Sequence, residues 1–186
     1  MNDKFLIVNA GSSSLKFSLY GENKEIVNGC IEKIGEEGSL WTIKTTDQKI
    51  SKLEGITTHQ EAVRVMLREL LANKFIDSID QIKGIGHRVL HGGEYFSNSV
   101  VIDDGVLNIL KKLIPLGPLH HPGEIAGIES MMEVLPNVLQ VAVFDTAFHQ
   151  TMPQVNYMYP VPYEWYVENG VRKYGFHGTS HNILPM

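Results

Sequence analysis

The stretch N-A-G-S-S-S-L-K, residues 9–16, is the most informative part of the chain, because its residue types suit an anion site. Gly11 lets the backbone turn tightly, the N–H groups and hydroxyls of the three following serines can converge on one anion, and Lys16 adds a positive charge. A solvated hairpin loop would use the same residues. The turn is therefore a candidate phosphate site whose interpretation depends on the other motifs.

A second motif, G-H-R-V-L-H-G-G over residues 86–93, places Arg88 between two histidines and ahead of paired glycines. The planar guanidinium suits a carboxylate or a phosphoryl group. An arginine that pairs with an internal acid would fit the same pattern. A metal site at His87 and His91 is disfavoured, because residues four apart on a strand lie far apart and no third ligand is placed by spacing.

The third motif is Y-G-F-H-G-T-S-H, residues 174–181. His177 lies between two glycines, where a histidine can donate a hydrogen bond to an oxyanion. Thr179 or Ser180 is expected to cap a helix that starts there. A zinc pair at His177 and His181 is disfavoured, because the glutamate of H-E-x-x-H is missing.

Two further polar residues follow apolar runs: Asn9 closes the first and Asp145 closes a later one. Because α/β sheets place ligands at the carboxyl ends of their strands, these side chains are expected to share one site. A turn or helix cap in D-T-A-F explains Asp145 equally simply. His120 and His121, beside a Pro-led helix, have the pattern of structural histidines.

Several elements must position these groups. Apolar and alternating runs predict strands over 5–8, 15–19, 25–34, 39–45 and 138–144, the first of them buried on both faces. Thr58 and Glu61 form a capping-box pattern at the start of a helix. Two more helices are expected, one from 103 or 104 to just before Pro115 and one from Pro122 to Pro136.

Composition excludes several classes of protein. At 186 residues, with 43% hydrophobic and 20% charged residues, the chain has enough apolar residues for the core of one domain. The net charge of -5 and the lack of a Lys/Arg run argue against a nucleic-acid surface. A single cysteine, Cys30, excludes an internal disulfide, and no segment reads as a signal peptide or membrane span. A cytoplasmic protein is expected.

These motifs, with P-L-H-H-P at 118–122 and V-F-D-T-A-F-H at 143–149, resemble in order and approximate spacing the acetate/propionate/butyrate kinase family of the actin-like ATPase superfamily. The resemblance implies an α/β, ribonuclease H-like fold, with a five-stranded mixed sheet and helices on its faces. It further implies reversible Mg²⁺-dependent phosphoryl transfer between ATP and acetate, giving acetyl phosphate and ADP, in a cytoplasmic homodimer without nucleic-acid or membrane partners.

Motif positions carry the family's roles onto this chain. Arg88 is implied to contact the acetate carboxylate or the transferring phosphoryl group, His177 to stabilise the transition state, and Asp145 to act on Mg²⁺ or the acyl substrate. The implied phosphate- and ATP-binding residues are Asn9, Ser12, Ser14 and Lys16, with Asn9 also at the metal. The implied acyl-binding residues, beside Arg88, are Leu90, Leu119, His120 and Phe176, whose apolar members would receive the acetate methyl.

The chain departs from the family in two respects. His121 stands where the family has the asparagine of P-L-H-N-P, which implies altered local hydrogen bonding. Family members are roughly twice as long, so we expect an amino-terminal domain over 1–182, an atypical tail at 183–186 and no carboxy-terminal nucleotide domain. A propionate or butyrate kinase fragment and a free-standing anion-binding module remain alternatives. A large exposed apolar patch would favour the fragment, and a polar surface the module.

Overall fold

The computed structural model describes residues 3–183. Of the expected tail at 183–186, only Ile183 falls within that range. The sheet has eight strands in the order β5-β4-β3-β2-β1-β6-β8-β7, so the expected α/β class holds but the expected five strands were wrong. The strands are β1 (Lys4–Ala10), β2 (Ser14–Gly21), β3 (Lys24–Glu32), β4 (Leu40–Lys44), β5 (Lys49–Leu53), β6 (Ile82–Val89), β7 (Val100–Val101) and β8 (Leu139–Phe144).

The five expected ranges leave out three strands: the central β6, where two glycines interrupt the apolar pattern, and two strands at the sheet's edges, whose sequence signals are weak. β5 reads K-I-S-K-L and is largely exposed, so it lacks the apolar face that identifies a strand. β7 has only two residues, Val100 and Val101, and joins the sheet by pairing antiparallel with β8. Short and charged edge strands are one way in which proteins discourage further sheet pairing.

The centre of the sheet changes from antiparallel to parallel at β1. This strand pairs antiparallel with β2 on one side and parallel with β6 on the other, and β6 pairs parallel with β8. Because side chains alternate along a strand, Leu6 and Val8 face the core, whereas Phe5, Ile7 and Asn9 face the opposite side. The carboxyl ends of three strands therefore meet at one edge.

Three helices follow the expected start signals. In α1 (His59–Ala72), the Thr58 hydroxyl accepts a hydrogen bond from the Glu61 amide. In α2 (Asp104–Lys112), Asp103 accepts from the Val106 amide. Pro122 lies in the first turn of α3 (His121–Val134). α3 packs against α1, α2, β1 and β6.

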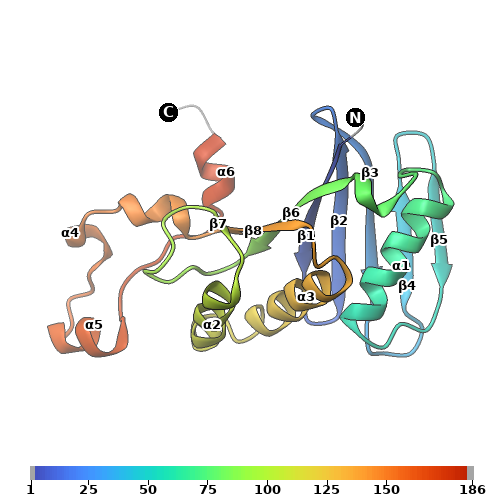
Figure 1. The fold of residues 1–186 in the computed structure, drawn as a ribbon. Helices are drawn as coiled ribbons and strands as arrows, with labels where there is room; N and C mark the ends of the chain where they lie inside the picture. Colours follow the sequence, from blue (N-terminus) through green and yellow to red (C-terminus); the bar gives the residue numbers. More distant parts are fainter. Residues whose placement is uncertain (1–2, 184–186) are drawn as a thin grey trace.

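The last part of the described chain, residues 145–183, leaves the sheet. A short 3-10 helix (Ala147–Thr151), α4 (Gln154–Tyr157), α5 (Tyr163–Asn169) and α6 (Gly178–Ile183) follow β8. Figure 1 shows α4 and α5 at the far end of the molecule from β5, and α6 back near the end of β8. No helix within residues 3–183 has the length and apolarity needed to cross a bilayer.

The sheet's two faces differ in cover. α1 and α3 bury the face that carries Leu6 and Val8. On the other face Phe5, Ile7 and Leu139 keep 49%, 48% and 55% of their surface exposed. The expectation that residues 5–8 are buried on both faces was therefore wrong, because no described element covers the second face at these positions. We call the surface formed by Phe5, Ile7, Leu139 and Val141 the open face.

Two glycines let α3 lie directly against the turn between β1 and β2. A Cβ atom on Gly123 would lie 2.6 Å from the Ser12 amide nitrogen, and one on Gly127 would collide with the Cβ of Ala10. The His59 ring also contacts the turn, with its Nε2 2.7 Å from the Gly11 carbonyl oxygen. The turn is thus fixed by α1 and α3, unlike a free hairpin loop.

Replacing Gly123 with alanine tests this packing. Alanine favours a helix by about 1 kcal/mol over glycine, but a Cβ against backbone atoms is an overpacking contact that costs about 1–3 kcal/mol. We expect Gly123→Ala to lower the free energy of unfolding in urea. Gly55→Ala, where no atom lies within 4 Å of the added Cβ, is the control. A more stable Gly123→Ala protein would contradict the packing.

Candidate active site

A cleft of about 630 Å³ lies over the carboxyl ends of β6 and β8, on the side of the open face. It is lined by Ile7, Gly86, His87, Arg88, Val143, Asp145, His177, Thr179 and Ser180. The cleft thus brings together Arg88, Asp145 and His177, which come from three separate sequence motifs. Its lining includes the apolar Ile7 and Val143, and its charged groups Arg88 and Asp145 lie at the end of β6 and just after β8.

Arg88 and Asp145 form a two-pronged ion pair at this end. Nε of Arg88 donates to Oδ1 of Asp145 at 3.1 Å and an Nη donates to Oδ2 at 2.7 Å. The Asp145 side chain is 4% exposed and the Arg88 side chain 44% exposed. The carboxylate raises the pKa of Arg88. Both oxygens of Asp145 are engaged, while three N–H groups of the guanidinium remain for other acceptors.

His177 is held beside this pair by the backbone. Its φ of 56° is in the left-handed region. Its carbonyl accepts hydrogen bonds from the Ser180 and His181 amides, so His177 directly precedes α6. The expectation that Thr179 or Ser180 caps this helix was wrong, because both lie inside it. The Gly178 amide donates to the Asp145 carbonyl at 2.8 Å, which ties the start of α6 to β8.

The candidate phosphate turn lies at the same edge of the sheet. The Gly11 amide donates to the Ser14 carbonyl at 2.8 Å, which closes the turn. Asn9 and Lys16 are register partners on β1 and β2, and both occupy the side of the sheet that carries Ile7 and Arg88. Ser12 is exposed at the tip. None of these residues is among those that line the cleft.

Of the residues expected to bind the acyl group, Arg88 lines the cleft, and the other four lie outside its lining. Leu119 is 82% exposed and His120 is exposed at the start of α3. Phe176 meets the His91 ring edge-on, with 5.6 Å between ring centroids. Leu90 donates its amide to Glu124. In the described part of the chain these four side chains do not form one pocket with Arg88.

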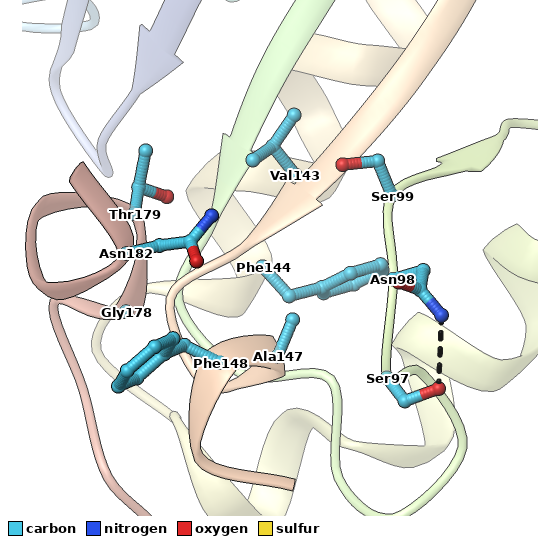
Figure 2. Close-up of a pocket in the computed structure, with 10 residues that line it drawn as sticks. All are labelled: Ser97, Asn98, Ser99, Val143, Phe144, Ala147, Phe148, Gly178, Thr179 and Asn182. Atoms are coloured by element: carbon cyan, nitrogen blue, oxygen red, sulfur yellow. Dashed lines mark hydrogen bonds between the residues drawn. The ribbon is translucent and has the colours of Figure 1, made fainter. Parts of the chain in front are cut away.

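A smaller hollow of about 190 Å³ adjoins the cleft, and the two share Val143 and Thr179. Figure 2 shows Asn182 of α6 directed into it from one side and the segment 97–99 on the other, with Phe144 at its base. The Phe144 ring stacks on Phe96 at 4.6 Å. Hydroxyl, amide and apolar groups line this hollow, and no charged side chain does, so it does not suit a phosphate.

Sequence reasoning missed a set of buried polar residues beneath the site. Glu124 is buried and its Oε1 accepts from the Leu90 amide at 3.1 Å. Burial raises the pKa of Glu124 to about 7. The Thr146 hydroxyl accepts from the Gly92 amide at 2.9 Å. The sequence offers little signal for Glu124, because an acid in the first turn of a helix is ordinary.

The two histidines of the Arg88 motif are also buried. Nε2 of His87 lies 2.8 Å from the side-chain oxygen of Gln140, and burial lowers the pKa of His87 to about 4. Nδ1 of His91 accepts from the Gly93 amide at 2.9 Å, and burial lowers the pKa of His91 to about 4. These two buried, hydrogen-bonded rings have the features of structural histidines rather than of a pair of metal ligands. Over residues 3–183, no group of three or more His, Cys, Asp or Glu side chains is placed to hold a metal ion.

Comparison with known proteins agrees with this fold. The profile of the acetokinase family matches residues 4–185, and the chain belongs to that family. It is 52% identical over 183 residues to acetate kinases of Geobacillus sp. and of Bacillus cytotoxicus. These matches cover 97% of this chain but only 46% of each relative, so the chain spans about half the length of these relatives.

Solved structures give the same result. The chain superposes on the crystal structure of acetate kinase from Porphyromonas gingivalis with a TM-score of 0.91 and 41% identity. It superposes on a propionate kinase from Francisella tularensis with a TM-score of 0.90 and 41% identity. Each match covers 96% of this chain and 46% of the other.

The lowered pKa of His87 predicts acid sensitivity. Below its ordinary pKa the unfolded chain binds a proton that the folded chain excludes, so stability falls as the pH drops from about 6.5 to about 4. For a fully buried histidine this loss is on the order of 2 kcal/mol. His87→Gln should show a shallower loss between pH 7 and pH 4.5 in urea unfolding. His181→Gln, at an exposed position of the last described helix, is the control; identical slopes for all three proteins would contradict the prediction.

Proposed function

We propose that this chain supplies the acyl- and phosphoryl-binding side of an acetate kinase, which transfers a phosphoryl group reversibly between ATP and acetate and yields acetyl phosphate and ADP. One observation carries the proposal. The Arg88 guanidinium is held by both carboxylate oxygens of Asp145 and keeps free N–H donors at a cleft that His177 also lines. The chain that carries this arrangement belongs to the acetokinase family.

The geometry supports a clamp for a transferring phosphoryl group. Such transfer proceeds through a loose transition state, so it needs positioning and charge neutralisation more than a nucleophilic side chain. Asp145 orients Arg88, whose remaining N–H groups can meet the acetate carboxylate or the equatorial phosphoryl oxygens. His177, exposed at the cleft, can donate to the same developing charge.

The turn after β1 is proposed to hold phosphate oxygens of the nucleotide, through Asn9, Ser12, Ser14 and Lys16. Mg²⁺ would neutralise phosphate charge beside it. The described residues fit this metal only in part, because Asn9 gives a single carboxamide oxygen and Asp145 is already paired with Arg88. One protein oxygen suffices where phosphates and waters supply the other ligands.

Acetate rather than a longer acid is proposed from Leu90, Leu119 and Phe176, which suit a small methyl pocket once the rest of the enzyme closes over them. A propionate kinase is the second candidate, since the Francisella tularensis protein is as similar as the Porphyromonas gingivalis one. One methylene changes discrimination by only about 1–3 kcal/mol. Side-by-side kinetics with acetate and propionate separate the two.

We propose further that residues 1–182 form an amino-terminal domain and that nucleotide binding needs a carboxy-terminal domain outside this chain. The half-exposed Phe5, Ile7 and Leu139 support a covering partner over a finished, free-standing module. In this proposal the complete enzyme is a cytoplasmic homodimer.

The 186-residue chain alone should not form acetyl phosphate at a measurable rate, because it provides one side of the clamp and no adenosine site that we identify. The measurement is acetyl hydroxamate formation from acetate, ATP and Mg²⁺. A chimera that joins this chain to the remaining part of the Geobacillus sp. enzyme should be active. Turnover by the chain alone at the chimera's rate would contradict the proposed division of the site.

Arg88→Lys in that chimera tests the clamp. Lysine brings one point charge in place of two aligned donors, so we expect kcat/KM for acetate to fall by about 100-fold or more. Arg64→Lys, at an exposed position of α1, is the matched control and should leave the kinetics unchanged. Wild-type kinetics for Arg88→Lys would show that Arg88 only supports the fold.

A further inference from the structure

Two buried side chains at the start of α3 have polar atoms without partners. His121 is 0% exposed, and neither of its ring nitrogens makes a hydrogen bond within the described chain. Oε2 of Glu124 is likewise buried without a partner. Nδ1 of His121 and Oε2 of Glu124 lie 3.8 Å apart. Unsatisfied buried polar atoms are costly, so two of them facing each other call for an explanation.

Glu124 also connects α3 to the strand that carries Arg88. Its Oε1 accepts from the amide of Leu90, which follows the last residue of β6. The His121 ring has little freedom, because a Cβ on Gly117 would lie 2.7 Å from its Cδ2. The pair therefore joins the first turn of α3 to the backbone two residues beyond Arg88.

The surroundings favour the uncharged form of both side chains. Burial raises the pKa of Glu124 to about 7, with the hydrogen bond from the Leu90 amide and the charge of Arg88 opposing this change and Asp145 adding to it. Burial and the neighbouring His120 lower the pKa of His121, and the backbone of His91 opposes this change. His91, on the segment after β6, is also buried and has a lowered pKa. A neutral carboxyl has an O–H donor and a neutral imidazole has an acceptor, so Oε2 of Glu124 and Nδ1 of His121 satisfy each other after a shift of about 1 Å. Nε2 of His121 is then the remaining atom of the pair without a partner.

We infer that Glu124 is a positioning residue: its buried carboxyl carries a proton on Oε2, donates it in a hydrogen bond to Nδ1 of His121, and through Oε1 holds the Leu90 amide that follows Arg88. The hydrogen bond from the Leu90 amide is observed, and the one to His121 is inferred from two buried atoms without partners that lie 3.8 Å apart. Their effect on acetate binding rests on the proposed function.

Ionisation of Glu124 would change the site. A carboxylate there could no longer donate to Nδ1 of His121, and it would place a second negative charge near the Arg88–Asp145 pair. It would then compete with Asp145 for the guanidinium and weaken the binding of an anionic substrate. Neutral Glu124 thus keeps Arg88 available to the cleft.

The first test needs no substrate and uses the 186-residue chain. In NMR spectra, His121 should be neutral with its proton on Nε2, and the Leu90 amide shift should titrate with a midpoint near pH 7. Glu124→Gln keeps an acceptor for Leu90 and a donor for His121, so it should retain the His121 signals and abolish the Leu90 titration. Glu129→Gln, on the exposed side of α3, should change neither.

An imidazolium signal for His121 at pH 7 would overturn the inference, because it would show an ion pair. A Leu90 amide that does not titrate between pH 5 and pH 9 in the wild type would overturn it as well. Both measurements are made on the unsubstituted chain, so they decide the matter even if a variant does not fold.

The second test uses the active chimera. KM for acetate should rise about fivefold between pH 7 and pH 8 as Glu124 ionises, with kcat little changed. Glu124→Gln should flatten this rise, and Glu129→Gln should not. An equal rise in Glu124→Gln would refute the effect on substrate binding. A chimera without any kinase activity would instead refute the proposed function, and the NMR result would still decide the role of Glu124.

Discussion

Parallel pairing of β1, β6 and β8 is the constraint on which the site depends. It brings the carboxyl ends of three strands to one edge, where the turn after Asn9, the strand end at Arg88 and the residue after β8, Asp145, lie together. Side-chain alternation then decides which groups face the cleft. Arg88 shares a side with Ile7, whereas His87 turns toward Gln140 in the interior. A shift of one residue in the β6 register would exchange their places.

Local signals predicted most of the elements that position the site. The Thr58 cap, Pro122 in the first turn of α3 and the apolar run before Asp145 all correspond to observed boundaries. The missed strand β5 is polar, and its place depends on pairing with β4 rather than on its own pattern. The apolar residues Phe5 and Ile7 predicted a strand that is buried on both faces. A sequence pattern indicates that a side chain favours burial, but it does not show whether the same chain provides the element that buries it.

The site was predictable where a residue's type already implied its chemistry. The Arg88 and His177 motifs led to groups that do line one cleft, although their roles stay predictions. The buried carboxyl of Glu124 was not predictable, because Glu124 and Asp104 both read as ordinary first-turn acids. What separates them is tertiary: Asp104 is exposed, while Glu124 is enclosed by the segment after β6.

Glu124 and Asp145 show how one fold assigns different charges to two carboxyls near the same arginine. Asp145 receives two hydrogen bonds from the guanidinium, and this direct pairing stabilises a carboxylate despite burial. Glu124 receives one hydrogen bond from a neutral amide and faces an uncharged imidazole, so burial dominates. A single guanidinium cannot give both carboxyls the same pairing. Because Glu124 carries a proton, Arg88 pairs with Asp145 alone, and its remaining N–H groups stay available to an anion in the cleft.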